Sequence, residues 1–215
     1  QFSHYLMNPY WDRISRRFAD TGLHNDNGDK VKVYFIPSYL NGDDGIFNMS
    51  YYDLLIGLDA TFFPSYYEPW GYTPLESLAF RVPTLTTTLA GFGQWVNDYW
   101  KKGEHPGIEV VERDDNNYNR VVDAVVARLR EIAALDARKK KSYMANARKV
   151  ADIALWDNQM KYYQEAYTLA LDKVSERSQA DPTWNEDIIT KYKDYKVETP
   201  NWKSVMVTRH LPAKL

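Results

Sequence analysis

The 215-residue sequence contains no cysteine, only four histidines and no long apolar run. The absence of cysteine excludes disulfide bonds and thiolate metal sites, and it is typical of a cytoplasmic protein. The histidines, His4, His24, His105 and His210, are scattered without the spacing of metal ligands, so we expect no metal site. No apolar segment approaches the length of a membrane span.

An excess of one charge is also lacking, since 27 basic and 29 acidic residues give a net charge of −2. This balance gives no electrostatic reason to expect a nucleic acid or an anionic membrane as partner. Aromatic residues are abundant, at 15% of the chain. Such a content is typical of carbohydrate-handling proteins, and equally of proteins with large aromatic cores. The length suits one domain with a substantial core and an appendage.

The most informative stretch is FFPSYYEPWGYTPLE, residues 62–76. The apolar run 58–63 predicts a strand that ends at Pro64, because proline cannot donate to a sheet ladder. A helix is predicted to begin at Thr73, with the hydroxyl as N-cap, proline in the next position and Glu76 completing a capping box. The loop between strand and helix carries more functional side chains than a tight turn requires, which indicates a binding site.

The loop is suited to an anion. Gly71 allows the backbone to approach a ligand closely, and the N–H groups of Tyr72 and Thr73 point outward at the positive end of the helix dipole. A phosphate fits this position. Glu68 and Glu76, one before the helix and one in its first turn, can face the same cleft.

The string FPSYYEPWGYTPLE is followed by Pro83, by Thr84 and the threonines 86–88, and by Gly91-Phe92-Gly93. Together these residues closely resemble the donor-site segment of the animal and fungal type of glycogen synthase. The resemblance implies the two-domain GT-B fold and transfer with retention of configuration. The family's E-x7-E pair falls on Glu68 and Glu76. That pair alone is common among glycosyltransferases, whereas the whole string is specific.

The resemblance also implies roles for single residues. Glu68 is expected to be catalytic and to lie beside the transferred glucose. The expected donor-binding residues are Tyr51, Trp70, Gly71, Tyr72, Thr73 and Glu76, and further candidates are Tyr39, Gly91, Phe92 and Gly93. The ring of Tyr51 is expected to stack on the base, and Glu76 to hydrogen-bond the ribose hydroxyls. Alternatives stay open at this point: packing for the two tyrosines, the capping box for Glu76 and a plain turn for the glycines.

Periodicity predicts the surrounding elements. A β-α-β unit is expected from strand 60–63, helix 73–80 and strand 84–86, which places the loop at the carboxyl edge of a parallel sheet, where such sheets bind ligands. Further strands are predicted at 31–36 and 108–111, and helices at 50–58, 117–134, 137–153 and 156–171. The aromatic stripe of the last helix, Trp156, Met160, Tyr163 and Tyr167, is expected to pack in the core.

The predicted fold class is therefore α/β. It comprises a Rossmann-like parallel sheet with flanking helices, as in the C-terminal half of a GT-B glycosyltransferase, followed by C-terminal helices and an extended tail. Residues 1–174 are expected to form a nucleotide-sugar-binding domain truncated at its start, and 175–215 a linker or wrapping tail. The last fifteen residues faintly resemble the opening of bacterial α-glucan phosphorylases, which suggests a fusion to a further domain.

The function implied is transfer of glucose from a nucleotide diphosphate glucose to the non-reducing 4-hydroxyl of an α-1,4-glucan. UDP-glucose is favoured over ADP-glucose as donor, no cofactor is expected, and the acceptor glucan is expected to bind a domain that this chain lacks. This fragment alone is therefore expected to be inactive. Two alternatives are a non-catalytic nucleotide- or glucan-binding module, and another retaining GT-B enzyme related to sucrose or trehalose-phosphate synthases. The oligomeric state stays open.

Overall fold

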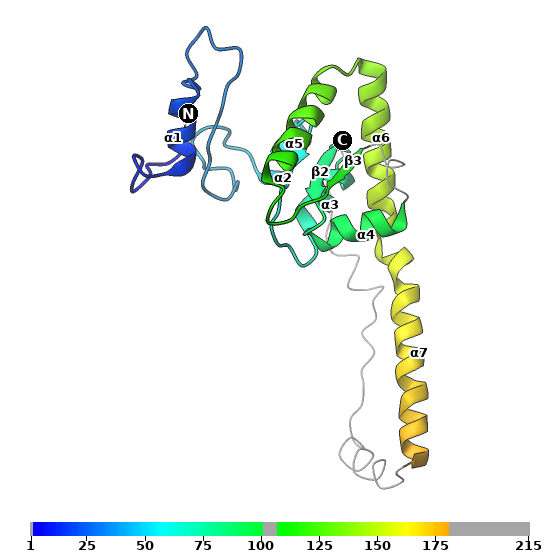
Figure 1. Cartoon of the computed structure of the whole chain (residues 1–215). Coiled ribbons are helices and arrows are strands. Elements are labelled where there is room, and N and C mark those ends of the chain that lie inside the picture. Colours follow the sequence, from blue (N-terminus) through cyan, green and yellow to red (C-terminus); the bar gives the residue numbers. More distant parts are fainter. Residues whose placement is uncertain (1, 101–106, 181–215) are drawn as a thin grey trace. The chain divides into compact units, whose positions relative to one another are not determined.

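The computed structural model describes residues 2–100 and 107–180 (Figure 1). The chain divides into two compact units, Gln1–Asn158 and Gln159–Leu215. The predicted division between residues 174 and 175 stays a prediction. In chain order the elements are α1 (Arg13–Asp20), α2 (Tyr51–Leu55), β1 (Thr61–Phe62), α3 (Tyr72–Ala79), β2 (Thr84–Thr87), α4 (Gly91–Tyr99), β3 (Ile108–Val111), α5 (Tyr118–Ala133), α6 (Ala137–Ile153) and α7 (Trp156–Ala180).

The described strands form one parallel sheet in the order β1-β2-β3. Thr61 pairs with Thr84, and Thr84 pairs in turn with Ile108. All three strands therefore end at the same edge of the sheet. The predicted β-α-β unit and the α/β class with a Rossmann-like parallel sheet are confirmed.

Side chains alternate between the two faces of the sheet, as the pleat of a strand requires. On one face, Leu85 and Val111 pack against Val121 of α5. On the other face, Ile108 packs in a larger cluster with buried residues of α3, α4 and α6, among them Leu78 and Phe92. Figure 1 shows the strands lying between α5 and α6. The core thus has three layers, and its sheet supports the loops at the carboxyl edge.

The predicted strand at residues 31–36 is wrong. The segment forms only an isolated bridge, between Phe35 and Phe2. The side chain of Asn25 bonds both the backbone N–H and the carbonyl of Val33, at 2.8 and 2.7 Å, and so occupies groups that a neighbouring strand would use. The apolar run has β propensity but lacks a partner strand among the described residues.

The predicted helices at 117–134 and 137–153 are confirmed within one residue. The helix predicted at 50–58 is shorter, because α2 ends at Leu55 after a start capped by Ser50. The last helix extends to Ala180, so the first six residues of the predicted tail are helical, and residues 181–215 lie outside the described part.

Within the described residues no helix has both the length and the apolar character needed to cross a membrane.

In the described part of the chain the aromatic stripe of α7 does not form a core, contrary to the prediction. Its four residues are exposed, with Trp156 at 63% and Tyr167 at 61%. Helical spacing of aromatic residues predicts an apolar face, but it does not provide the surface that would cover that face.

Close packing of α6 on the sheet depends on Gly107. Its φ is +118°, and an added Cβ would lie 2.5 Å from the backbone nitrogen of Ala147. Since the obstacle is helix backbone, we expect Gly107→Ala to lower the free energy of unfolding by roughly 1–3 kcal/mol in urea denaturation. Gly28 has nothing within 4 Å, so Gly28→Ala is the control and should change the value by less than about 0.5 kcal/mol. Equal stability of the two variants would contradict this packing.

Candidate functional site

Three loops meet at the carboxyl edge of the sheet: 63–71 after β1, 88–90 after β2 and 112–117 after β3. The first two are joined by backbone hydrogen bonds. Glu68 donates to the carbonyl of Leu89 at 3.1 Å, and its own carbonyl accepts from Gly91 at 3.0 Å. Glu68 and Ala90 form a parallel bridge. The main chain of the predicted catalytic residue is therefore held by the loop after β2.

Gly91 and Gly93 were predicted to lie in a loop, and this prediction is wrong. They form the first turn of α4. A Cβ at Gly91 would collide with the carbonyl oxygen of Pro69, and one at Gly93 with that of Thr87. Neither glycine needs a positive φ. Both instead allow the start of the helix to lie directly against backbone, that of the loop after β1 and that of the last residue of β2.

Two aromatic candidates, Trp70 and Phe92, have their rings in or against the core. Phe92 is fully buried, and Trp70 lies edge-on to it, with ring centroids 5.6 Å apart at 71°. The backbone N–H of Phe92 donates to the carbonyl of Trp70 at 2.6 Å. Both side chains therefore pack against the core, and their predicted contact with a donor stays a prediction.

Helix α3 begins one residue after Gly71, which is the N-cap and has φ 107° and ψ 74°. The prediction of Thr73 as N-cap is wrong, since the helix already includes Tyr72 and Thr73 and no side chain caps it. The left-handed conformation, which glycine adopts easily, turns the chain into the helix without a capping side chain. In the described part of the chain the N–H groups of Tyr72 and Thr73 have no hydrogen-bond partner, as expected for an anion site.

Glu76 does not complete a capping box, because it lies too far along the helix. Its Oε1 accepts a hydrogen bond of 2.9 Å from the hydroxyl of Tyr52, and this bond raises the pKa of Tyr52. The ring of Tyr52 stacks on Phe80, with centroids 5.3 Å apart. The second carboxylate oxygen of Glu76 has no partner among the residues that the structure describes, so it can bind a ligand hydroxyl.

Tyr51 lies beside this pair, with its ring centroid 5.2 Å from that of Tyr52. Burial raises the pKa of Tyr51, with a further contribution from the charge of Glu76. Its hydroxyl and that of Ser77 are close and buried, but neither completes a hydrogen bond of good geometry. Tyr51 thus lies close to Glu76, as expected if Tyr51 stacks on the base and Glu76 binds the adjoining ribose. Tyr39 is 91% exposed, and its ring makes no described contact with these residues.

Glu68 is partly buried. Within residues 2–100 and 107–180 its carboxylate forms no hydrogen bond or ion pair, and its Cγ lies 3.4 Å from where a Cβ on Gly71 would be. The side chain therefore lies next to the start of α3 with its oxygens available. The described residues contain no group of three or more histidine or carboxylate side chains that could hold a metal ion.

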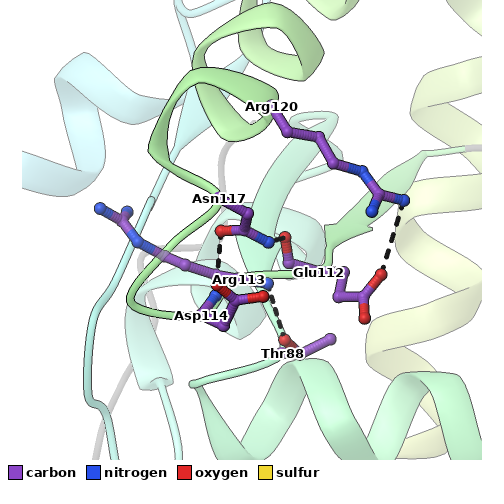
Figure 2. A network of polar contacts seen from close by, with 6 residues as sticks. All are labelled: Thr88, Glu112, Arg113, Asp114, Asn117 and Arg120. Carbon is purple, nitrogen blue, oxygen red and sulfur yellow. Dashed lines mark hydrogen bonds and ion pairs between the residues drawn. The ribbon is translucent and has the colours of Figure 1, made fainter.

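The sequence reasoning missed Arg113, which follows β3 at the same edge and is only 7% exposed. Its guanidinium carbon lies 3.5 Å from the ring centroid of Tyr66, and its Nη1 donates to the carbonyl of Pro64. Its backbone N–H donates to Oγ1 of Thr88 at 3.0 Å (Figure 2). A basic residue two positions after the predicted strand 108–111 was the available signal.

The cap assignment can be tested by stability. Thr73→Ala should change the free energy of unfolding by less than about 0.5 kcal/mol, because the Thr73 hydroxyl caps nothing. Gly71→Ala should cost roughly 1–2 kcal/mol, because a Cβ is unfavourable in the left-handed region. Thermal unfolding without ligand measures both. A loss of about 1 kcal/mol in Thr73→Ala, as for an N-cap, would overturn the assignment.

Comparison with known proteins identifies the family of the chain. The sequence model of the family described as glycogen synthase matches residues 2–210. The chain is 29% identical over 169 residues to the glycogen [starch] synthase of Neurospora crassa, and 30% identical over 171 residues to isoform 1 of the glycogen [starch] synthase of Saccharomyces cerevisiae. It is 30% identical over 176 residues to the liver glycogen [starch] synthase of Mus musculus.

These alignments cover 79–80% of this chain but 24% of each relative. The chain therefore spans about a quarter of the length of the relatives it matches. The family match includes both the loop 63–71 and the strands that support it. The chain belongs to the glycogen synthase family.

Proposed function

We propose that this chain forms the donor-binding part of a retaining glucosyltransferase that elongates an α-1,4-glucan with glucose from a nucleotide diphosphate glucose. The observation that carries the proposal is the open start of α3. Two backbone N–H groups, on Tyr72 and Thr73, lack partners in the described chain and follow a left-handed glycine at the carboxyl edge of a parallel sheet. Glu68 and Glu76, each with unpaired carboxylate oxygens, lie before and within the same helix.

The diphosphate of the donor fits the start of α3. The helix dipole contributes only about 0.3–1 kcal/mol at an exposed site. Fixed N–H donors favour the charge that accumulates on the departing diphosphate, and they do so without reorganisation.

Glu68 is the proposed catalytic group. Its position beside Gly71 supports this role, because the anomeric carbon of a glucose bound through the proposed diphosphate site would lie next to Gly71. A carboxylate there orients the sugar hydroxyls and stabilises an oxocarbenium-like centre while the bond to the diphosphate breaks. Because its main chain is bridged to Ala90, this carboxylate is held on a supported loop.

The nucleoside is proposed to bind along α3 toward α2. Glu76 has an oxygen for a ribose hydroxyl, and Tyr51, close to it, offers a ring for the base. UDP-glucose is the proposed donor, in line with the sequence resemblance, although an aromatic ring accepts uracil and adenine alike. The α-glucan acceptor and action in the cytoplasm are proposals about the whole protein.

Nucleotide binding tests the donor site directly. Isothermal titration of this chain should show saturable UDP binding that is tighter than ADP binding. Tyr51→Phe should retain the affinity, because a phenyl ring also stacks, whereas Tyr51→Leu should weaken it by about tenfold or more. Tyr118→Leu, at the exposed start of α5, is the control and should bind normally. Binding that survives in Tyr51→Leu, or tighter ADP binding, would contradict the assignment.

Turnover tests Glu68. In the natural polypeptide that contains this chain, Glu68→Gln should lower kcat for glucosyl transfer by roughly a hundredfold or more, because the charge is lost but the shape is kept. The matched control is Glu112→Gln, an exposed carboxylate at the same edge that pairs with Arg120 at 3.5 Å. Equal kcat values in the two variants would show that Glu68 is not catalytic. Nucleotide binding without any transfer in the wild-type protein would favour a non-catalytic module.

A further inference from the structure

We propose that Arg113 is a positioning residue for Glu68: it holds the segment 64–66, which leads into the catalytic loop, in the place that glucosyl transfer requires. The inference rests on the proposed function for its catalytic consequence. The claim that Arg113 holds the segment 64–66 does not depend on the proposed function, because it rests on contacts in the structure. Arg113 covers the ring of Tyr66 and donates to the carbonyl of Pro64, so that one side chain fixes two residues of that segment.

The surroundings of Arg113 favour a specific structural task. The side chain is buried, its Nε has no hydrogen-bond partner in the described part of the chain, and no carboxylate there neutralises it. Burying a cation without an ion pair is costly. What compensates here is an aromatic face and a backbone carbonyl, both from the loop after β1. The planar guanidinium can stack and donate at once, whereas an ammonium cannot.

The backbone of Arg113 is itself fixed (Figure 2). Its N–H bonds Oγ1 of Thr88, and the side chain of Asn117 closes the loop around it. Asn117 accepts from the N–H of Asp114 at 3.0 Å and donates to the carbonyl of Glu112 at 2.9 Å. The guanidinium therefore projects from a rigid loop, which is what a side chain needs to position another segment.

The contacts form a closed circuit between the three loops. Arg113 joins the loop after β3 to residues 64–66, and Oγ1 of Thr87 donates to the carbonyl of Ser65 at 2.7 Å. Two residues beyond Tyr66, the backbone N–H of Glu68 donates to the carbonyl of Leu89. The approach to Glu68 is thus held from the carboxyl ends of both β2 and β3. A displacement of about 1 Å at a catalytic group can cost roughly a hundredfold in rate, so this support has a catalytic effect.

The test compares variants of the two partners in the natural polypeptide. Arg113→Met and Tyr66→Leu should each lower kcat about tenfold or more and change KM for the nucleotide sugar by less than about threefold, because the carboxylate moves and the diphosphate site stays. Tyr66→Phe keeps the ring under the cation and should keep most of the turnover. Arg113→Lys should recover only part of it. The double variant Arg113→Met/Tyr66→Leu should lose little more than either single variant.

Arg128→Met is the matched control. Arg128 is also buried, at 8% exposure, and lies 5.0 Å from the ring centroid of Tyr143, far from the carboxyl edge. Its loss should lower stability and leave kcat unchanged. A second readout is independent of activity: amide hydrogen exchange at Glu68 and Gly91 should be about tenfold faster in Arg113→Met and unchanged in Arg128→Met.

The outcomes separate the two proposals. Suppose that amide exchange at Glu68 is faster in Arg113→Met and that the wild-type protein transfers no glucose. This pair of results would overturn the proposed function and leave the positioning contact standing. Transfer by the wild type with unchanged kcat in Arg113→Met would overturn the inference. Full recovery in Arg113→Lys would overturn it too, because the charge alone would then suffice. An equal loss of kcat in Arg113→Met and Arg128→Met would reduce Arg113 to a stabilising residue.

Discussion

The site depends on one close backbone contact, in which the first turn of α4 lies directly against residues 68–70. Only glycine at position 91 leaves room for the carbonyl of Pro69. That approach lets the carbonyls of Glu68 and Trp70 accept hydrogen bonds from the first two residues of α4. The loop that carries Glu68 therefore has the backbone bonding of a short strand at the point where the sheet has already ended, and the main chain of the proposed catalytic residue is fixed.

The same contact explains why two neighbouring helix starts differ. The N-terminus of α4 is already occupied by protein carbonyls, so its partial positive charge stabilises the loop. The N-terminus of α3 follows Gly71, whose left-handed backbone directs the chain into the helix without any capping side chain. A cap at this position would satisfy the N–H groups that an anion needs. The absence of a cap is therefore consistent with binding a diphosphate, and one helix start supports the loop while the other remains open to a ligand.

Sequence reasoning predicted the elements whose pattern is long and whose partners are near in sequence. The helices α5 and α6 and the strand β3 have clear periodicity, and their bounds were predicted within one residue. The strand at 31–36 failed because an asparagine side chain, eight residues before Val33, took the backbone groups that pairing would need. The start of α3 failed for a related reason: the hydroxyl and carboxylate at 73 and 76 match a capping box, but the left-handed Gly71 begins the helix earlier.

The residues of the site could be predicted only where they belong to a recognisable local sequence pattern. Glu68, Gly71 and Glu76 follow from the string between strand and helix, and the structure brings them to one edge. For Arg113 the only signal was its place two residues after a predicted strand, and that signal does not show its contact with the ring of Tyr66, 47 residues earlier. Sequence spacing cannot reveal that the loops after β1 and β3 share one cation across the intervening strand. Residues that hold a functional group in place are for this reason found from the folded structure, and here a buried charge without a carboxylate partner in the described chain is the basis for proposing Arg113.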